Sequence, residues 1–181
     1  MKRAILVNGI PASGKSTVAR GIAERLNCPL MTLDTVKDPL FAEFGIGDRD
    51  HNRKLGRASY AIIFNAIGDW PDPSCVVIDA WFGFQPLDLL DRHIAAAGLE
   101  GLAEVWCHAP AEVLAARYRA RLAERSAGHP GESYIPELVA LAARAAPTGR
   151  APAFDVDTTA PPPWDALMAW LAATLGDPGT G

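Results

Sequence analysis

Between Gly9 and Ser16 the chain reads GIPASGKS, which fits the pattern G-x-x-x-x-G-K-[S/T]. Glycines in such a loop let backbone N–H groups turn inward around an anion. An apolar run, RAILVN, precedes the loop, and a helix should begin within it, so that the start of this helix adds partial positive charge. The loop therefore predicts a site for the phosphates of a nucleotide.

The side chains after the second glycine have separate expected roles. Lys15 should reach the β- and γ-phosphates of ATP, the Ser16 hydroxyl should bind Mg²⁺, and Thr17 should lie near the α-phosphate. The rest of the loop should contribute through Gly9, Pro11, Ala12, Ser13 and Gly14. A chance match in a glycine turn is the alternative, and the expected strand and helix on either side argue against it.

Two large classes of phosphate-loop protein lack support in this sequence. A GTP switch needs N-K-x-D to read the base and D-x-x-G to hold the γ-phosphate, and neither pattern occurs. A AAA-type motor normally carries a separate helical lid domain, for which 181 residues leave little room. A compact kinase remains.

Asp34 ends the second apolar run, PLMTLD, which we read as a strand. Ligands of parallel sheets bind beyond the carboxyl ends of the strands, where the phosphate loop also lies. A carboxylate there can accept the proton of an attacking hydroxyl, so Asp34 is the expected general base. The alternative is that Asp34 caps a following helix.

Asp79 ends the most apolar run, CVVID, which has the pattern of a Walker-B strand. We expect Asp79 either to hold Mg²⁺ through a water or to contact the acceptor, and the sequence does not choose between them. A turn residue at the end of a strand is the alternative.

Arg117, Arg121 and Arg125 recur at every fourth position of an expected helix and therefore share one face. Three like charges in a row favour an anion opposite, and ATP is the obvious one. The polar, glycine-containing segment that follows, at about 125–134, resembles the lid of small kinases, in which arginines close over the phosphates. A solvated helix face neutralised by nearby glutamates is the alternative.

The acceptor should lie near Asp34 and the segment DAWFGF, where Trp81 could wall an apolar or ring-shaped compound. Phe82 is better explained by core packing. Lys37 and Arg53 could bind an anionic acceptor, as part of a basic cluster with Arg49, His51 and Arg57. Neutralisation of this cluster by Glu43, Asp48 and Asp50 is an equally good interpretation.

These residues need a framework that brings them together. We expect strands at residues 3–8, 29–34, 74–82, 102–109 and 153–159, and helices at about 15–26, 52–69, 86–97, 111–125 and 164–175. Apolar strands separated by helices indicate parallel pairing with helices on both faces. The expected fold is a doubly wound, three-layer α/β sandwich in one domain, residues 1–176, with a frayed tail at 177–181.

The composition of the chain limits the classes of partner that it can bind. The chain is 49% hydrophobic and 21% charged, with a net charge of −4, which argues against a long nucleic acid as partner. Its three cysteines are widely spaced and form no metal-binding pattern. Its first apolar run is too short for a signal peptide or a membrane span, so we expect a cytoplasmic protein without membrane contact.

The motifs together resemble the small P-loop kinases that include chloramphenicol phosphotransferase, zeta-toxin and polynucleotide-kinase-like proteins and AAA-family ATPase-like kinases, and more distantly shikimate and gluconate kinases. The segments that carry the resemblance are GIPASGKST, TLDTVK, VVIDAWF, HAPAEVLAARYRARLAER and DVDTT. The resemblance implies a P-loop NTPase fold with a five-stranded parallel sheet in the order 2-3-1-4-5. It also implies ATP, Mg²⁺, a hydroxyl acceptor, Asp34 as base, and Asp157 and Thr158 beside the adenine. The glycine-rich acceptor loop of shikimate kinases is missing.

Three hypotheses follow. The chain is an ATP-dependent kinase acting on a small-molecule hydroxyl, such as an antibiotic, a sugar or a related metabolite. Alternatively, its acceptor is a polynucleotide or a nucleotide sugar, or the chain is a regulatory module that binds ATP without catalysis. The sequence names neither the acceptor nor the oligomeric state.

Overall fold

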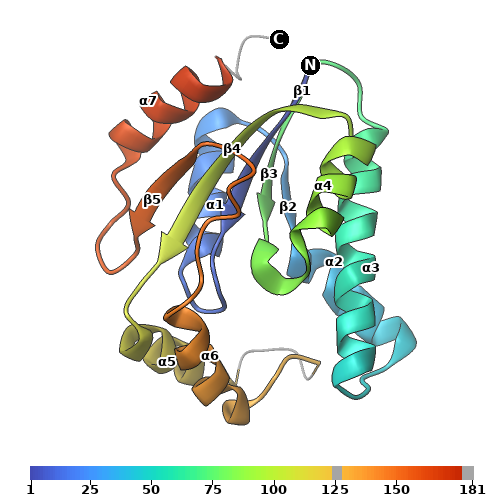
Figure 1. The fold of residues 1–181 in the computed structure, drawn as a ribbon, viewed down its shortest axis with the longest axis vertical. Coiled ribbons are helices and arrows are strands. Elements are labelled where there is room, and N and C mark those ends of the chain that lie inside the picture. The colour runs from blue at the N-terminus through green and yellow to red at the C-terminus, as the bar shows by residue number, and fades with distance from the viewer. Residues whose placement is uncertain (124–127, 177–181) are drawn as a thin grey trace.

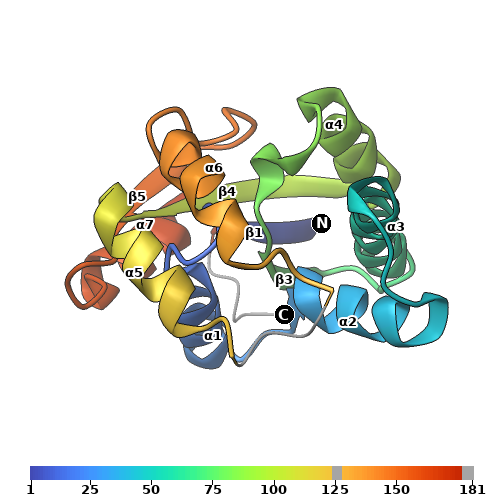
Figure 2. The ribbon, with the colours of Figure 1, turned by 90° about the horizontal axis from the view of Figure 1, so that it is seen from below.

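The computed structural model describes residues 1–123 and 128–176, in which five parallel strands form one sheet in the order β2-β3-β1-β4-β5. Helices cover both faces of the sheet (Figure 1), and α1 and α4 lie on opposite sides of it when the molecule is seen from below (Figure 2). The predicted three-layer fold and strand order are confirmed. Among the described residues, no helix is long and apolar enough to cross a membrane.

The elements alternate along the chain. The strands are β1 (Lys2–Asn8), β2 (Leu30–Thr32), β3 (Ser74–Asp79), β4 (Leu99–His108) and β5 (Ala153–Asp157). The helices are α1 (Lys15–Leu26), α2 (Leu33–Phe44), α3 (Arg49–Gly68), α4 (Leu87–Ala96), α5 (Ala111–Ala120), α6 (Ile135–Ala142) and α7 (Trp164–Leu175). Two short 3₁₀ turns, η1 (Phe82–Phe84) and η2 (Glu132–Tyr134), complete the described elements.

The core follows from the two-residue period of the central strand, because successive side chains of a strand point to opposite faces. Ile5 and Val7 of β1 belong to the apolar cluster that contains residues of α1 and α7. Ala4 and Leu6 belong to the cluster that contains residues of α3 and α4. All four are fully buried, so β1 delivers the phosphate loop from the most protected part of the molecule.

The region around Asp34 differs from the prediction. The second strand ends at Thr32, and α2 begins at Leu33, so Asp34 lies in the first turn of a helix. The Thr32 hydroxyl accepts a hydrogen bond from the Thr35 N–H at 3.0 Å and caps this helix. Thr32 rather than Asp34 is therefore the N-cap, and Asp34 stands where a helix dipole favours a carboxylate.

The arginine segment also differs from the prediction. Helix α5 ends at Ala120 instead of continuing to 125. Its end tightens, because the N–H groups of Arg121 and Leu122 donate to the carbonyls three residues back, those of Tyr118 and Arg119. Arg121 therefore lies just beyond the helix, and the single helical face predicted for the arginines is not formed as proposed. Arg125 lies outside the described residues, as do part of the predicted lid and the tail at 177–181.

Candidate functional site

The phosphate loop connects β1 to α1. Gly14, the residue before the helix, has a φ of 83°, a left-handed conformation that favours glycine. A Cβ atom there would also approach the Thr158 side chain to 3.1 Å. The described residues of α1 include its whole first turn, and no side chain caps the start of this helix. The N–H groups at a helix start without such a cap can bind an anion.

A cavity of about 600 Å³ opens beside the loop. Its wall includes half of the candidate site residues, namely Pro11, Ala12, Lys15, Ser16, Asp34, Lys37, Arg53, Asp79 and Trp81. The other described candidates are not part of this wall, namely Gly9, Ser13, Gly14, Thr17, Arg117, Arg121, Asp157 and Thr158. Residues from α3 and from the segment between α5 and α6 complete the wall. Part of the phosphate loop therefore shares one cavity with Asp34 and with the four residues predicted for the acceptor, although Asp34 reaches the cavity from a helix.

Asp79 lies beside the loop because the register of β1 and β3 pairs it with Val7. Its side chain is almost fully buried, and its Oδ1 atom has no hydrogen-bond partner among the described residues. A buried polar atom without a partner is costly, and a ligand bound at Asp79 would remove this cost. Mg²⁺ fits this need, since it binds proteins through one or two carboxylates together with waters and phosphate oxygens. Ser16 offers a hydroxyl on the same wall.

Tyr60 of α3 also lines the cavity and bonds to the segment after β3. Its hydroxyl donates to the Trp81 carbonyl at 2.6 Å. Burial raises the pKa of Tyr60, and the charges of Asp79 and Asp34 raise it further. The raised pKa keeps the Tyr60 hydroxyl protonated at neutral pH, as a donor to the Trp81 carbonyl.

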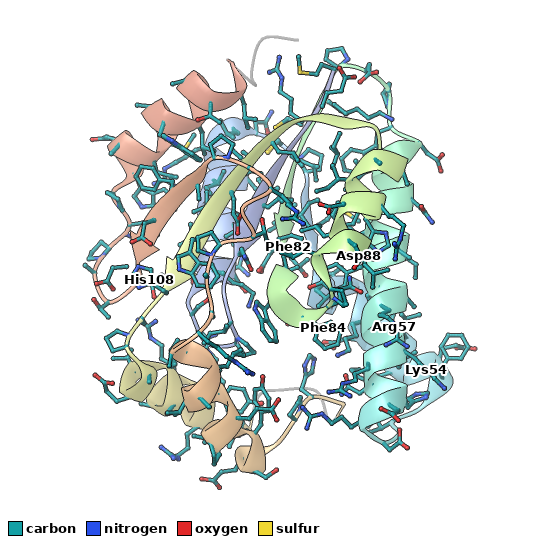
Figure 3. All side chains as sticks on the ribbon, viewed as in Figure 1. Lys54, Arg57, Phe82, Phe84, Asp88 and His108 are labelled. Atoms are coloured by element: carbon teal, nitrogen blue, oxygen red, sulfur yellow. The ribbon has the colours of Figure 1, made fainter. Side chains whose placement is uncertain are left out.

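Aromatic rings form one wall of the cavity. Phe84 is stacked on Tyr60 with a centroid distance of 6.4 Å, and Trp81 meets Phe84 edge-on at 6.3 Å. Phe84 lies at the turn after β3, next to α3 (Figure 3). Phe82 is 1% exposed and belongs to the core, in agreement with the packing interpretation.

The basic cluster divides. Lys37, Arg49 and Arg53 line the cavity, whereas His51 and Arg57 are not part of its wall. Arg49 pairs with Glu137 of α6 at 2.7 Å, and Arg53 lies 3.8 Å from Asp50. The acid that neutralises Arg49 comes from a distant helix instead of from its sequence neighbours.

The described part of the predicted lid, 128–134, lies against α2 and α3. The Asn52 amide donates to the Gly128 carbonyl at 2.7 Å, and its oxygen accepts from the Lys37 ammonium at 2.6 Å. His129 lies 2.9 Å from an Asp38 carboxylate oxygen. Asn52 and Asp38 were missed from the sequence, because no local motif marks residues whose partners lie 76 and 91 positions away in the chain.

Arg117 is directed toward the phosphate loop. Its guanidinium donates to the Thr158 hydroxyl at 2.9 Å and to the Thr158 carbonyl at 2.7 Å. The same hydroxyl donates to the Ser13 carbonyl at 2.7 Å. Thr158 therefore links Arg117 to the loop, whereas Arg121 is exposed and outside the cavity wall.

Asp157 is occupied within its own turn. Its Oδ1 atom accepts from the Thr159 N–H at 2.9 Å and from the Thr159 hydroxyl at 2.7 Å. The backbone bond from Thr159, followed by the hydroxyl bond, lowers the pKa of Asp157. This is the capping arrangement common for an aspartate after a strand.

The comparisons with known proteins bear on the family and the fold of this chain. A family model described as "AAA domain" matches residues 5–147. No curated protein matches the chain in sequence. The fold is similar to that of a Chloroflexus aurantiacus j-10-fl protein provisionally described as a kinase, with a TM-score of 0.75, 24% identity, and 96% and 98% of the two chains covered.

Two further solved structures share the fold. Chaetomium thermophilum Kti12, in complex with ADP-AlF3, has a TM-score of 0.65 and 18% identity over 96% of this chain and 99% of its own. A gluconokinase from Sinorhizobium meliloti 1021 has a TM-score of 0.59 and 24% identity over 96% and 90%.

Proposed function

The chain belongs to this AAA-domain family, and from that premise we propose that it is an ATP-dependent kinase for a hydroxyl group on a small molecule. One observation carries the proposal. The phosphate loop and an exposed carboxylate, Asp34, line the same cavity, and aromatic and basic side chains line it further out. A protein that only senses ATP has no need of a carboxylate in that place.

In the proposed reaction, Asp34 accepts the proton of the acceptor hydroxyl while the oxygen of that hydroxyl attacks the γ-phosphorus of ATP. The bond between the γ-phosphorus and the oxygen that links it to the β-phosphate breaks, and ADP leaves. Lys15 and the N–H groups at the start of α1 donate to the phosphate oxygens and stabilise their charge. Arg117, anchored on Thr158, adds positive charge beside the loop. Mg²⁺, held by Ser16 and Asp79, would supply further charge neutralisation.

The acceptor side favours a compound with a flat face. Trp81 and Phe84 offer ring surfaces, on which flat or ring-shaped compounds pack well. Tyr60 stacks on Phe84 and donates a hydrogen bond to the Trp81 carbonyl. Lys37 and Arg53 can donate to oxygen atoms at the edge of the acceptor. Sugars and ring-containing antibiotics both meet this description.

A screen for acceptor-dependent ADP release tests the proposal. Aminoglycosides, phenicols, sugars and sugar acids would be offered with Mg·ATP, and phosphorylated products identified by mass spectrometry. We expect Asp34→Asn to abolish transfer while the Kd for ATP stays near the wild-type value. The matched control is Asp165→Asn, which removes another exposed carboxylate from the first turn of a helix, α7, outside the cavity wall. Full-rate transfer by Asp34→Asn would show that the base is wrongly assigned.

A further inference from the structure

A buried polar network lies behind the phosphate loop, and none of the roles assigned so far uses it. Asn8, the last residue of β1, is 1% exposed, and Glu104 of β4 is fully buried. The Asn8 amide nitrogen donates to the Glu104 Oε1 atom at 2.7 Å. Buried groups of this kind are kept only when their hydrogen bonds are satisfied, which makes their partners informative.

The carbonyl oxygen of the Asn8 side chain joins two functional segments. It accepts from the Gly9 N–H, the first residue of the phosphate loop, at 2.8 Å. It also accepts from the Phe82 N–H, in the segment that carries Trp81, at 3.0 Å. One side-chain oxygen therefore holds the donor loop and the acceptor loop in a fixed relation.

Glu104 fixes the orientation of this amide. Its two oxygens accept from the Thr148 N–H at 2.9 and 3.0 Å, and Oε2 also accepts from the Thr148 hydroxyl at 2.6 Å. Because a carboxylate surrounded by these donors acts as an acceptor, it can pair only with the NH₂ end of Asn8. The oxygen of Asn8 must then face Gly9 and Phe82.

We propose that Asn8 is a positioning residue that transmits the state of the phosphate loop to the acceptor loop, with Glu104 fixing its orientation. This inference rests on the proposed function for its meaning, because it concerns the alignment of donor and acceptor. The coupling itself is a physical property and can be measured without any acceptor.

The network permits a matched exchange of groups. In Asn8→Asp, the new carboxylate faces Glu104 and the donor between them is lost, so two like charges are buried together. In Glu104→Gln, the introduced NH₂ group must point either at the NH₂ group of Asn8 or at the donors of Thr148. In both orientations a donor faces a donor, and one hydrogen bond is lost. The double variant Asn8→Asp/Glu104→Gln restores one donor between the two side chains and leaves an oxygen for Thr148, so the original pattern returns with its polarity reversed.

The readout is the ¹⁹F NMR resonance of Trp81 in protein labelled with 5-fluorotryptophan, assigned among the five tryptophans by Trp81→Phe. Mg·ATP is the probe. We expect Mg·ATP to shift this resonance in the wild-type protein, and Asn8→Asp to lose the shift and bind Mg·ATP about tenfold more weakly. The double variant should recover both, giving a strong coupling in the double-mutant cycle.

The control is thermal denaturation of every variant. If the double variant recovers thermal stability but not the Trp81 response, Asn8 is only structural and the proposal is overturned. A wild-type protein whose Trp81 resonance ignores Mg·ATP would also overturn it. Failure of the proposed function would look different, because transfer could be missing while the Trp81 response and its rescue remain.

Discussion

Removing the Tyr60 hydroxyl tests how the acceptor loop is held. Tyr60→Phe keeps the ring that stacks on Phe84 and removes only the donor to the Trp81 carbonyl, 2.6 Å away. A buried acceptor left without its donor costs about 1–3 kcal/mol, and because this bond is only partly buried we expect about 1–2 kcal/mol. For a chain of this size, 1 kcal/mol corresponds to about 2–4 °C in Tm. The expected fall in Tm is therefore about 2–8 °C.

The assay is thermal denaturation followed by circular dichroism, combined with the resonance of fluorinated Trp81. Tyr118→Phe is the matched control. Tyr118 and Tyr60 are both 1% exposed, and the Tyr118 hydroxyl donates to the Pro130 carbonyl, also at 2.6 Å. Both variants should lose similar stability, but Tyr60→Phe should move the Trp81 resonance more, because Tyr60 bonds directly to the Trp81 carbonyl whereas Tyr118 only belongs to the apolar cluster against which Trp81 packs. If the Tm of Tyr60→Phe falls by less than about 1 °C, or if Tyr118→Phe perturbs Trp81 equally, the reasoning is refuted.

Further predictions concern the start of α2 and the thiols. Thr32→Ala removes the cap of α2 and should cost about 1 kcal/mol of stability, measured by urea denaturation, and it should slow transfer because Asp34 loses its support. The Cys28 thiol, by its hydrogen bond, lowers the pKa of Cys75, so Cys75 should react with iodoacetamide at a lower pH than Cys28 or Cys107. Burial raises the pKa of Cys107 to about 12, so mass spectrometry should find it unmodified in the folded protein. Early labelling of Cys107, or unchanged stability in Thr32→Ala, would contradict these statements.

Strong local signals made the donor half of the site predictable. The strand, loop and helix from Lys2 to Leu26 match the expectation within one residue, because an apolar run, glycines and an amphipathic helix follow one another without interruption. The strand order came from the resemblance of the whole set of motifs. The sequence also placed the candidate acceptor residues near Asp34, and Lys37, Arg53, Asp79 and Trp81 line the same cavity as Asp34.

Helix α2 was missed because Pro39 lies inside it and argues locally against a helix. The other missed features depend on contacts between residues that are far apart in the chain. The network of Asn8, Glu104 and Thr148 joins residues 96 and 44 positions apart, so nothing near Asn8 in the sequence announces it. The pairing of Arg49 with Glu137 has the same origin.

The central claim is that Asp34 receives the proton of an acceptor held in the same cavity as the phosphates of ATP. A crystal structure with Mg²⁺, ADP, aluminium fluoride and an acceptor from the screen tests it most directly. The account predicts that the acceptor hydroxyl lies within about 2.6–3.2 Å of the Asp34 carboxylate and in line with the aluminium fluoride group. It also predicts that the flat face of the acceptor compound packs on Trp81. An acceptor bound outside this cavity, or a hydroxyl directed at another residue, would contradict the account.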